Sequence, residues 1–62
     1  MTFEEVAEMV GGWPKDRSVP RKLSEAIKNA EGLDQVLMGN FVEAIVTASG
    51  TPEDFALIDK YF

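Results

Sequence analysis

The sequence contains no cysteine and no histidine. Without thiols the chain forms no disulfide, and without either residue it lacks the usual ligands of a zinc site. The same absence removes the commonest general base of enzymes and their strongest nucleophile. The serines therefore have no imidazole to activate them. We expect a protein that is not an enzyme and that uses no metal and no cofactor.

Long apolar runs are also missing from the sequence. No segment approaches the roughly 20 consecutive apolar residues that a membrane-spanning helix needs. The first five residues contain no basic region followed by an apolar run, which is the pattern of a secretory signal. We therefore expect no membrane partner and a cytoplasmic location.

The chain is short and acidic. A domain of 62 residues buries only about 60% of the surface that its unfolded chain exposes, so its stability margin is thin. Small domains without disulfides or metals often regain margin by forming oligomers or by docking on a partner. Eleven acidic residues against six basic ones give a net charge of −5, which disfavours non-specific attraction to phosphate backbones.

The spacing of apolar residues predicts an all-α fold, a compact three- to four-helix bundle forming one domain. Thr2 and Glu5 form a capping-box pattern at the first helix, and Thr51 precedes a proline at the last one. Ser18 and Asp34 are the residues expected to cap the second and third helices. The predicted helices span roughly residues 2–11, 18–31, 33–49 and 52–61.

The third predicted helix is apolar over much of its circumference, which is typical of a helix in the middle of a bundle. Gly39 interrupts it, and we expect this residue to mark a close helix–helix approach or a local break. Residues 41–47 also have a strand-like composition, but a lone strand would have nothing to pair with. The apolar residues of this predicted helix form two stripes along it. The first contains Leu33, Leu37, Phe41, Ala44, Ile45 and Ala48, and the second contains Val36, Met38, Val42 and Val46.

Five of the six basic residues lie between positions 15 and 28. Arg21 and Lys22 fall in the first turn of the second helix, where the helix dipole disfavours positive charge. One interpretation is that the bases pair with acids of the first helix or are solvated. The other is that they form a patch for an acidic protein surface or for nucleic-acid phosphates. The bases concerned are Lys15, Arg17, Arg21, Lys22 and Lys28, and the acids are Glu4, Glu5 and Glu8.

Trp13 is the only tryptophan and lies in the predicted loop between the first two helices. The favoured interpretation is that its indole closes the open end of the bundle. The alternative is an exposed binding residue beside two bases, since tryptophan and arginine are enriched in interface hot spots. The residues that we expect to bind the partner are Trp13, Lys15, Arg17, Arg21 and Lys22.

Ala7 is followed four residues later by Gly11, and the helix after them starts with basic residues. Over residues 3–28 this arrangement resembles the start of helix-turn-helix DNA-binding domains. The resemblance implies a DNA-binding regulator that would use the helix at 18–31. The connection from Gly11 to Ser18 is longer than the usual turn of three or four residues.

We expect a protein-interaction module, a regulator or inhibitor that binds a larger protein. By analogy of size and composition alone, it resembles the accessory proteins of phages and mobile elements. DNA binding is the first alternative. The second is a self-assembling structural subunit, such as a homodimer, with Tyr61 and Phe62 as candidate oligomer contacts.

Overall fold

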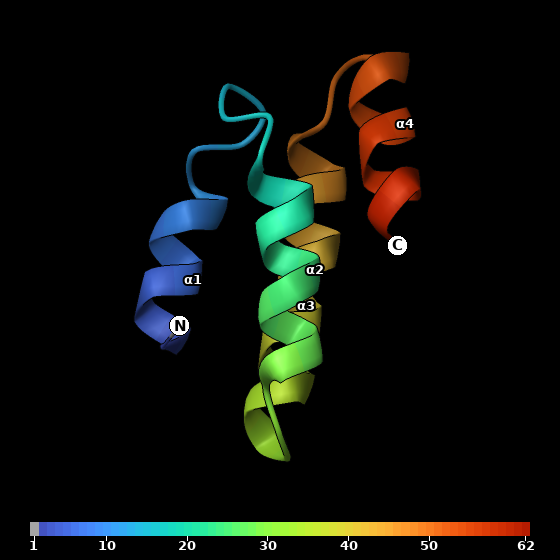
Figure 1. The fold of residues 1–62 in the computed structure, drawn as a ribbon. Helices are drawn as coiled ribbons and strands as arrows, with labels where there is room; N and C mark the ends of the chain where they lie inside the picture. Colours follow the sequence, from blue (N-terminus) through green and yellow to red (C-terminus); the bar gives the residue numbers. More distant parts are fainter. Residues whose placement is uncertain (1) are drawn as a thin grey trace.

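The computed structural model describes residues 2–62 and has four α-helices (Figure 1). The predicted all-α class is confirmed, and each helix boundary lies within two residues of its predicted position. Residues 41–47 lie inside the third helix, so the strand alternative is wrong. The helices are α1 (Phe3–Val10), α2 (Val19–Asn29), α3 (Leu33–Ala48) and α4 (Pro52–Tyr61).

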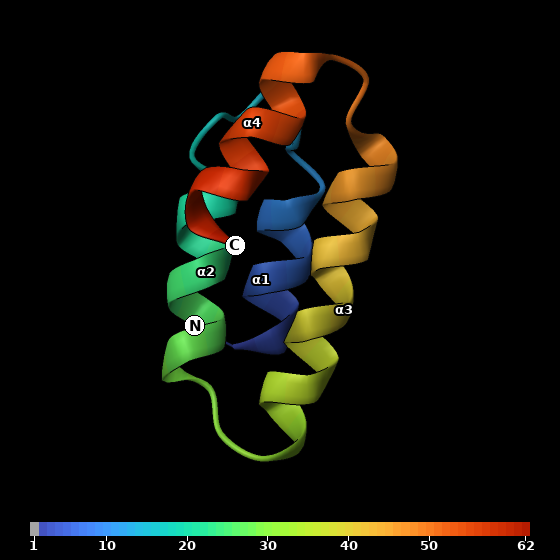
Figure 2. The same cartoon turned by 90° about the vertical axis from the view of Figure 1, so that its right-hand side faces the viewer.

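The α2 and α3 helices form an antiparallel hairpin at the centre of the fold (Figures 1 and 2). The α1 helix packs on one side of this hairpin and α4 packs on the other. The α2 helix contacts all three other helices, whereas the main contacts of α3 are with α1 and α2. The end of the hairpin that carries the α2–α3 turn extends beyond both flanking helices (Figure 2).

The core takes side chains from all four helices and from the loop after α1. Leu23 and Ile45, the two largest of its fully buried side chains, come from the two helices of the hairpin. The α2–α3 turn depends on Gly32, whose φ of 60° lies in a region that side-chain-bearing residues rarely adopt. The buried apolar residues are Val6, Trp13, Val19, Leu23, Met38, Ile45 and Ile58.

Helix capping follows the prediction at two of the four helix starts. Thr2 and Glu5 form both hydrogen bonds of the capping box, and the Thr51 hydroxyl accepts from the Asp54 N–H. Ser18 stands at the start of α2, but its side chain makes no capping bond because its hydroxyl donates to Asp16 instead. Ser18 therefore occupies the predicted N-cap position without its side-chain bond, whereas Asp34 lies two residues after the N-cap Gly32 of α3, so the prediction for Asp34 is wrong.

The α3 helix belongs to the central hairpin (Figure 1), but it is less buried than its apolar circumference predicted. Met38 and Ile45 are buried, but Leu33 and Leu37 on the same helix are exposed. The reason is the length of the neighbouring helices. At about 1.5 Å per residue, the 16 residues of α3 span about 24 Å, whereas the eight residues of α1 span about 12 Å. The α1 helix is therefore too short to cover its side of α3.

Gly39 marks neither a close helix approach nor a break, contrary to expectation. The α3 helix continues through it, and a Cβ atom built there would meet nothing within 4 Å. Because its surroundings are open, a larger side chain would fit there, and packing gives no reason for a glycine at this position.

Candidate functional site

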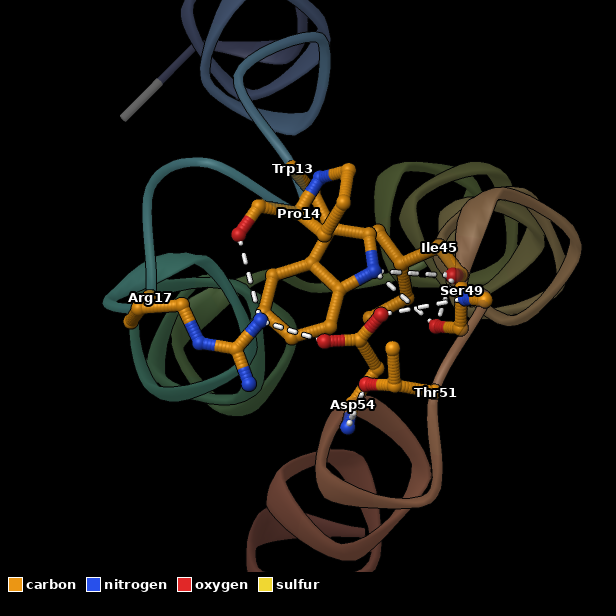
Figure 3. Close-up of polar contacts among 8 residues, drawn as sticks. Trp13, Pro14, Arg17, Ile45, Ser49, Thr51 and Asp54 are labelled. Carbon is orange, nitrogen blue, oxygen red and sulfur yellow. Dashed lines mark hydrogen bonds and ion pairs between the residues drawn. The ribbon is translucent and has the colours of Figure 1, made fainter.

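Trp13 is buried at the end of the bundle where α3 meets the loop to α4 (Figure 3). Only 5% of the residue is exposed. Its indole N–H donates to the Ile45 carbonyl and to the Ser49 hydroxyl, each at 3.0 Å. The indole closes the end of the bundle, as favoured from the sequence. It is not exposed for contact with a partner, so the alternative of an exposed Trp13 does not fit the structure.

Arg17 contacts the buried Trp13 ring and Asp54, and we call these three residues the Arg17 cluster (Figure 3). Its guanidinium carbon lies 4.8 Å from the centroid of the Trp13 ring, in cation–π geometry. The guanidinium donates to Asp54 Oδ1 at 2.5 Å and to the Pro14 carbonyl at 3.2 Å. Arg17 therefore links the α1–α2 loop to the start of α4.

Asp54 is the buried acidic partner in this cluster. Its second carboxylate oxygen accepts from the Gly50 N–H at 3.0 Å. This backbone bond, followed by the hydrogen bond from Arg17, lowers the pKa of the Asp54 carboxyl. The carboxylate thus holds the loop before α4 and the α1–α2 loop together, which makes the role of Arg17 structural.

The remaining bases of the predicted cluster are arranged differently. Arg21 is half exposed and pairs with Glu25 on its own helix at 3.7 Å. Lys15 is exposed, and Lys22 is half-buried beside a groove between α2 and α3. Within residues 2–62 the ion pairs are Arg17–Asp54 and Arg21–Glu25, so the expected pairing of the bases with the α1 acids is not found.

The aromatic residues at the end of α4 are only partly covered. The Tyr61 carbonyl accepts a hydrogen bond from the Ser24 hydroxyl at 3.2 Å, which fastens the last turn of α4 to α2. Phe62 is about half exposed, and the Tyr61 side chain is half-buried. Lys60 places its ammonium 5.5 Å from the centroid of the Tyr61 ring.

The structure reveals an apolar surface that the sequence analysis assigned to the core. Leu33 is 71% exposed and Leu37 is 38% exposed, and Ala44 and Ala48 are exposed on the turns above them. At about 100° per residue, these four positions of α3 fall within an arc of about 60°. Phe3 of α1 continues the surface. We call this surface the α1–α3 face, and it consists of Phe3, Leu33, Leu37, Ala44 and Ala48.

Phe3 is held beside α3 by a contact between aromatic rings. Its ring centroid lies 5.2 Å from that of Phe41, with the ring planes inclined by 34°. Phe41 stands one turn above Leu37, so the exposed edge of Phe3 extends the row of α3 side chains. The signal for this face was in the sequence, because α3 carries more apolar positions than one buried stripe requires.

Charge is distributed unevenly around this face. Within α1 and α3 there are five acidic residues and no lysine or arginine. All six bases of the chain lie elsewhere, in the α1–α2 loop, in α2 and in α4. The acids of these two helices are Glu4, Glu5, Glu8, Asp34 and Glu43.

A groove of about 380 Å³ lies between α2 and α3, near the end of the hairpin. Asp34 lines it and is one turn away from Leu37, so the groove borders the α1–α3 face. Its ionisable lining consists of three carboxylates and one ammonium group. These groups belong to Glu25, Glu31, Asp34 and Lys22.

Within residues 2–62, no group of three or more acidic side chains is gathered closely enough to hold a metal ion. None of the four helices in this part of the chain combines the length and the apolar character of a membrane span. No known protein family, curated protein or solved structure matches the sequence.

Proposed function

We propose that this protein is an interaction module, a regulator or inhibitor that acts by binding the surface of a larger protein. The α1–α3 face carries the proposal. It leaves Phe3 of α1 and Leu33 and Leu37 of α3 exposed, although α3 already contributes Met38 and Ile45 to the core. Single exposed apolar residues are ordinary on protein surfaces, whereas a contiguous exposed apolar patch is typical of an interaction site.

The geometry of α3 supports this proposal further. Its inward stripe, with Met38 and Ile45, is sufficient to hold it against α1 and α2. On the exposed stripe, 71% of Leu33 and 38% of Leu37 remain open to solvent in the isolated fold. A surface of this kind gains free energy only when a partner covers it, because removal of apolar area from water is what stabilises the contact.

The test is capture of a partner from a host lysate by the tagged protein, with and without nuclease, followed by mass spectrometry. The wild type is compared with Leu37→Gln and with Val46→Gln. Val46 is a matched control because it is 40% exposed and lies nine residues along α3, about 180° around the helix from Leu37. We expect one protein to survive nuclease treatment, to be lost with Leu37→Gln and to be retained with Val46→Gln. Absence of any captured protein would contradict the proposal.

The DNA-binding alternative is tested separately, by a mobility-shift assay over a series of salt concentrations. The α2 helix packs against all three other helices, which restricts the surface it could place in a DNA groove, and its Arg21 is paired with Glu25. This arrangement supports a protein partner over DNA. A shift at low salt that weakens steeply with added salt and disappears with Arg21→Glu would favour DNA instead.

A further inference from the structure

We propose that the partner segment bound by the α1–α3 face is a basic amphipathic helix, with one apolar stripe flanked by lysine or arginine. This inference rests on the proposed function and adds the chemistry of the partner. Two observations support the inference: the straight row of exposed apolar residues along α3, and the acidic side chains of α1 and α3.

The apolar part of the face has the spacing of a helix-binding surface. Leu33, Leu37, Ala44 and Ala48 follow one another at intervals of four, seven and four residues, so they form a straight row along α3. The two alanines allow a partner backbone to approach closely, and the two leucines offer side chains for it to pack on. A helix laid along such a row contacts it through residues at i, i+3, i+4 and i+7.

The charged surroundings determine the partner's polar flanks. Glu4 and Glu8 lie on exposed positions of α1, and Glu43 is exposed on α3. Because neither helix carries a base, a docked helix with acidic flanks would meet only like charges. Lysine and arginine flanks would meet opposite charges, and such complementarity raises the association rate and excludes wrong partners.

The groove between α2 and α3 strengthens this assignment. It borders the lower end of the face through Asp34, and with Glu25 and Glu31 it holds three carboxylates against one base, Lys22. A long basic side chain from a helix docked on the face can place its apolar stem along the groove and its charged end among these carboxylates.

A second copy of the chain is the less suitable occupant. A symmetric dimer brings the same surface patch of both copies together. Docking of two α1–α3 faces would therefore oppose five α1 and α3 acids with the same five acids of the partner. The repulsion disfavours this pairing, and the net charge of −5 on each copy adds to it.

The experiment uses a displayed library of helical peptides of roughly 18 residues, about 27 Å long and thus close to the length of α3. Leucine and alanine are fixed along one stripe, and each flanking position is randomised among lysine, glutamate and glutamine. The library is selected on the wild-type protein after depletion on the Leu33→Gln/Leu37→Gln double variant. We expect the recovered peptides to be enriched in lysine over glutamate.

The best recovered peptide is then synthesised with a fluorescent label, and its binding is measured by anisotropy. We expect roughly tenfold weaker binding to Leu37→Gln and no more than about a twofold change for Val46→Gln. Glu31→Gln/Asp34→Asn should weaken binding, whereas Glu53→Gln on α4 is the control and should not. Affinity should fall as salt is added, because screening weakens the interaction between exposed charges.

The contrary outcomes separate this inference from the proposed function. Equal recovery of lysine and glutamate would overturn the basic partner but leave the interaction module in place. A doubled mass in light scattering that Leu33→Gln/Leu37→Gln returns to the monomer mass would assign the face to a second copy. No selected peptide, together with lysate capture that persists with Leu37→Gln, would overturn only the assigned face. No selected peptide and no captured protein would overturn both proposals.

Discussion

Arg17 lies over the ring of Trp13, with its guanidinium carbon 4.8 Å from the ring centroid, while the same group binds Asp54. One side chain thus covers the buried indole and joins it to the start of α4. The Arg17 side chain nevertheless remains 47% exposed. Its position in the cluster also leads to two predictions about stability.

Replacement of Arg17 should destabilise the fold more than replacement of Arg21. Arg17→Ala removes the cation–π contact and leaves the buried Asp54 carboxylate without its cationic partner. Arg21→Ala removes only a 3.7 Å surface pair with Glu25, and such pairs contribute little. Urea unfolding followed by circular dichroism gives the comparison. Equal unfolding midpoints for the two variants would show that the Arg17 cluster does not stabilise the fold.

The Asp54 carboxylate should make stability depend on pH. Its folded-state pKa is lowered, first by the Gly50 N–H and then by Arg17, so the folded state favours the ionised form. The resulting stabilisation is complete above the pKa of the carboxyl in the unfolded chain, about 3.9, and is lost as the pH falls through the lower folded-state pKa.

Asp54→Asn isolates this contribution. The wild type should be more stable than Asp54→Asn at pH 7, and the difference should shrink as the pH is lowered below about 4. The pKa values of Glu5 and Asp16 are also lowered by hydrogen bonds, but both groups are present in both proteins and cancel in the difference. A difference in urea midpoint that stays constant from pH 7 to pH 3 would exclude the carboxylate as its source.

Helix content and most helix boundaries could be predicted from the sequence because their signals are local. The capping box at Thr2 and Glu5 involves residues three apart, and Thr51 with Pro52 starts α4 through neighbouring groups. The start of α3 was predicted correctly, but its capping residue was not, because Gly32, with φ of 60°, occupies the N-cap position in place of Asp34.

The candidate site was less predictable, since exposure depends on which helices reach one another. Leu33 and Ile45 were assigned to the same stripe, yet one is 71% exposed and the other is fully buried. Their difference comes from the short α1, which packs beside the upper part of α3 and leaves the lower part uncovered. The pairing of Arg17 with Asp54, 37 residues away, likewise has no local sequence signal.

Gly39→Ala should stabilise the protein by about 1 kcal/mol. Gly39 is inside α3, where glycine costs about that much relative to alanine, and an added Cβ meets nothing within 4 Å. Gly32→Ala is the matched control: its surroundings are equally open, but its φ of 60° makes alanine unfavourable, so this variant should be destabilised. Thermal unfolding of both variants provides the measurement. A loss of stability in Gly39→Ala would point to a contact of α3 that the isolated fold does not contain.

Exposed and buried apolar residues of α3 should differ in what their replacement changes. Ile45→Ala should cost about 2–5 kcal/mol of unfolding free energy, because Ile45 is fully buried in the core. Leu33→Gln should change the free energy by no more than about 0.5 kcal/mol, since its side chain is largely in water in the folded state. Urea denaturation of the purified proteins at low concentration separates the two effects. If Leu33→Gln were as damaging as Ile45→Ala, the residue would be packed in the protein as it exists in solution, and the α1–α3 face would already be covered.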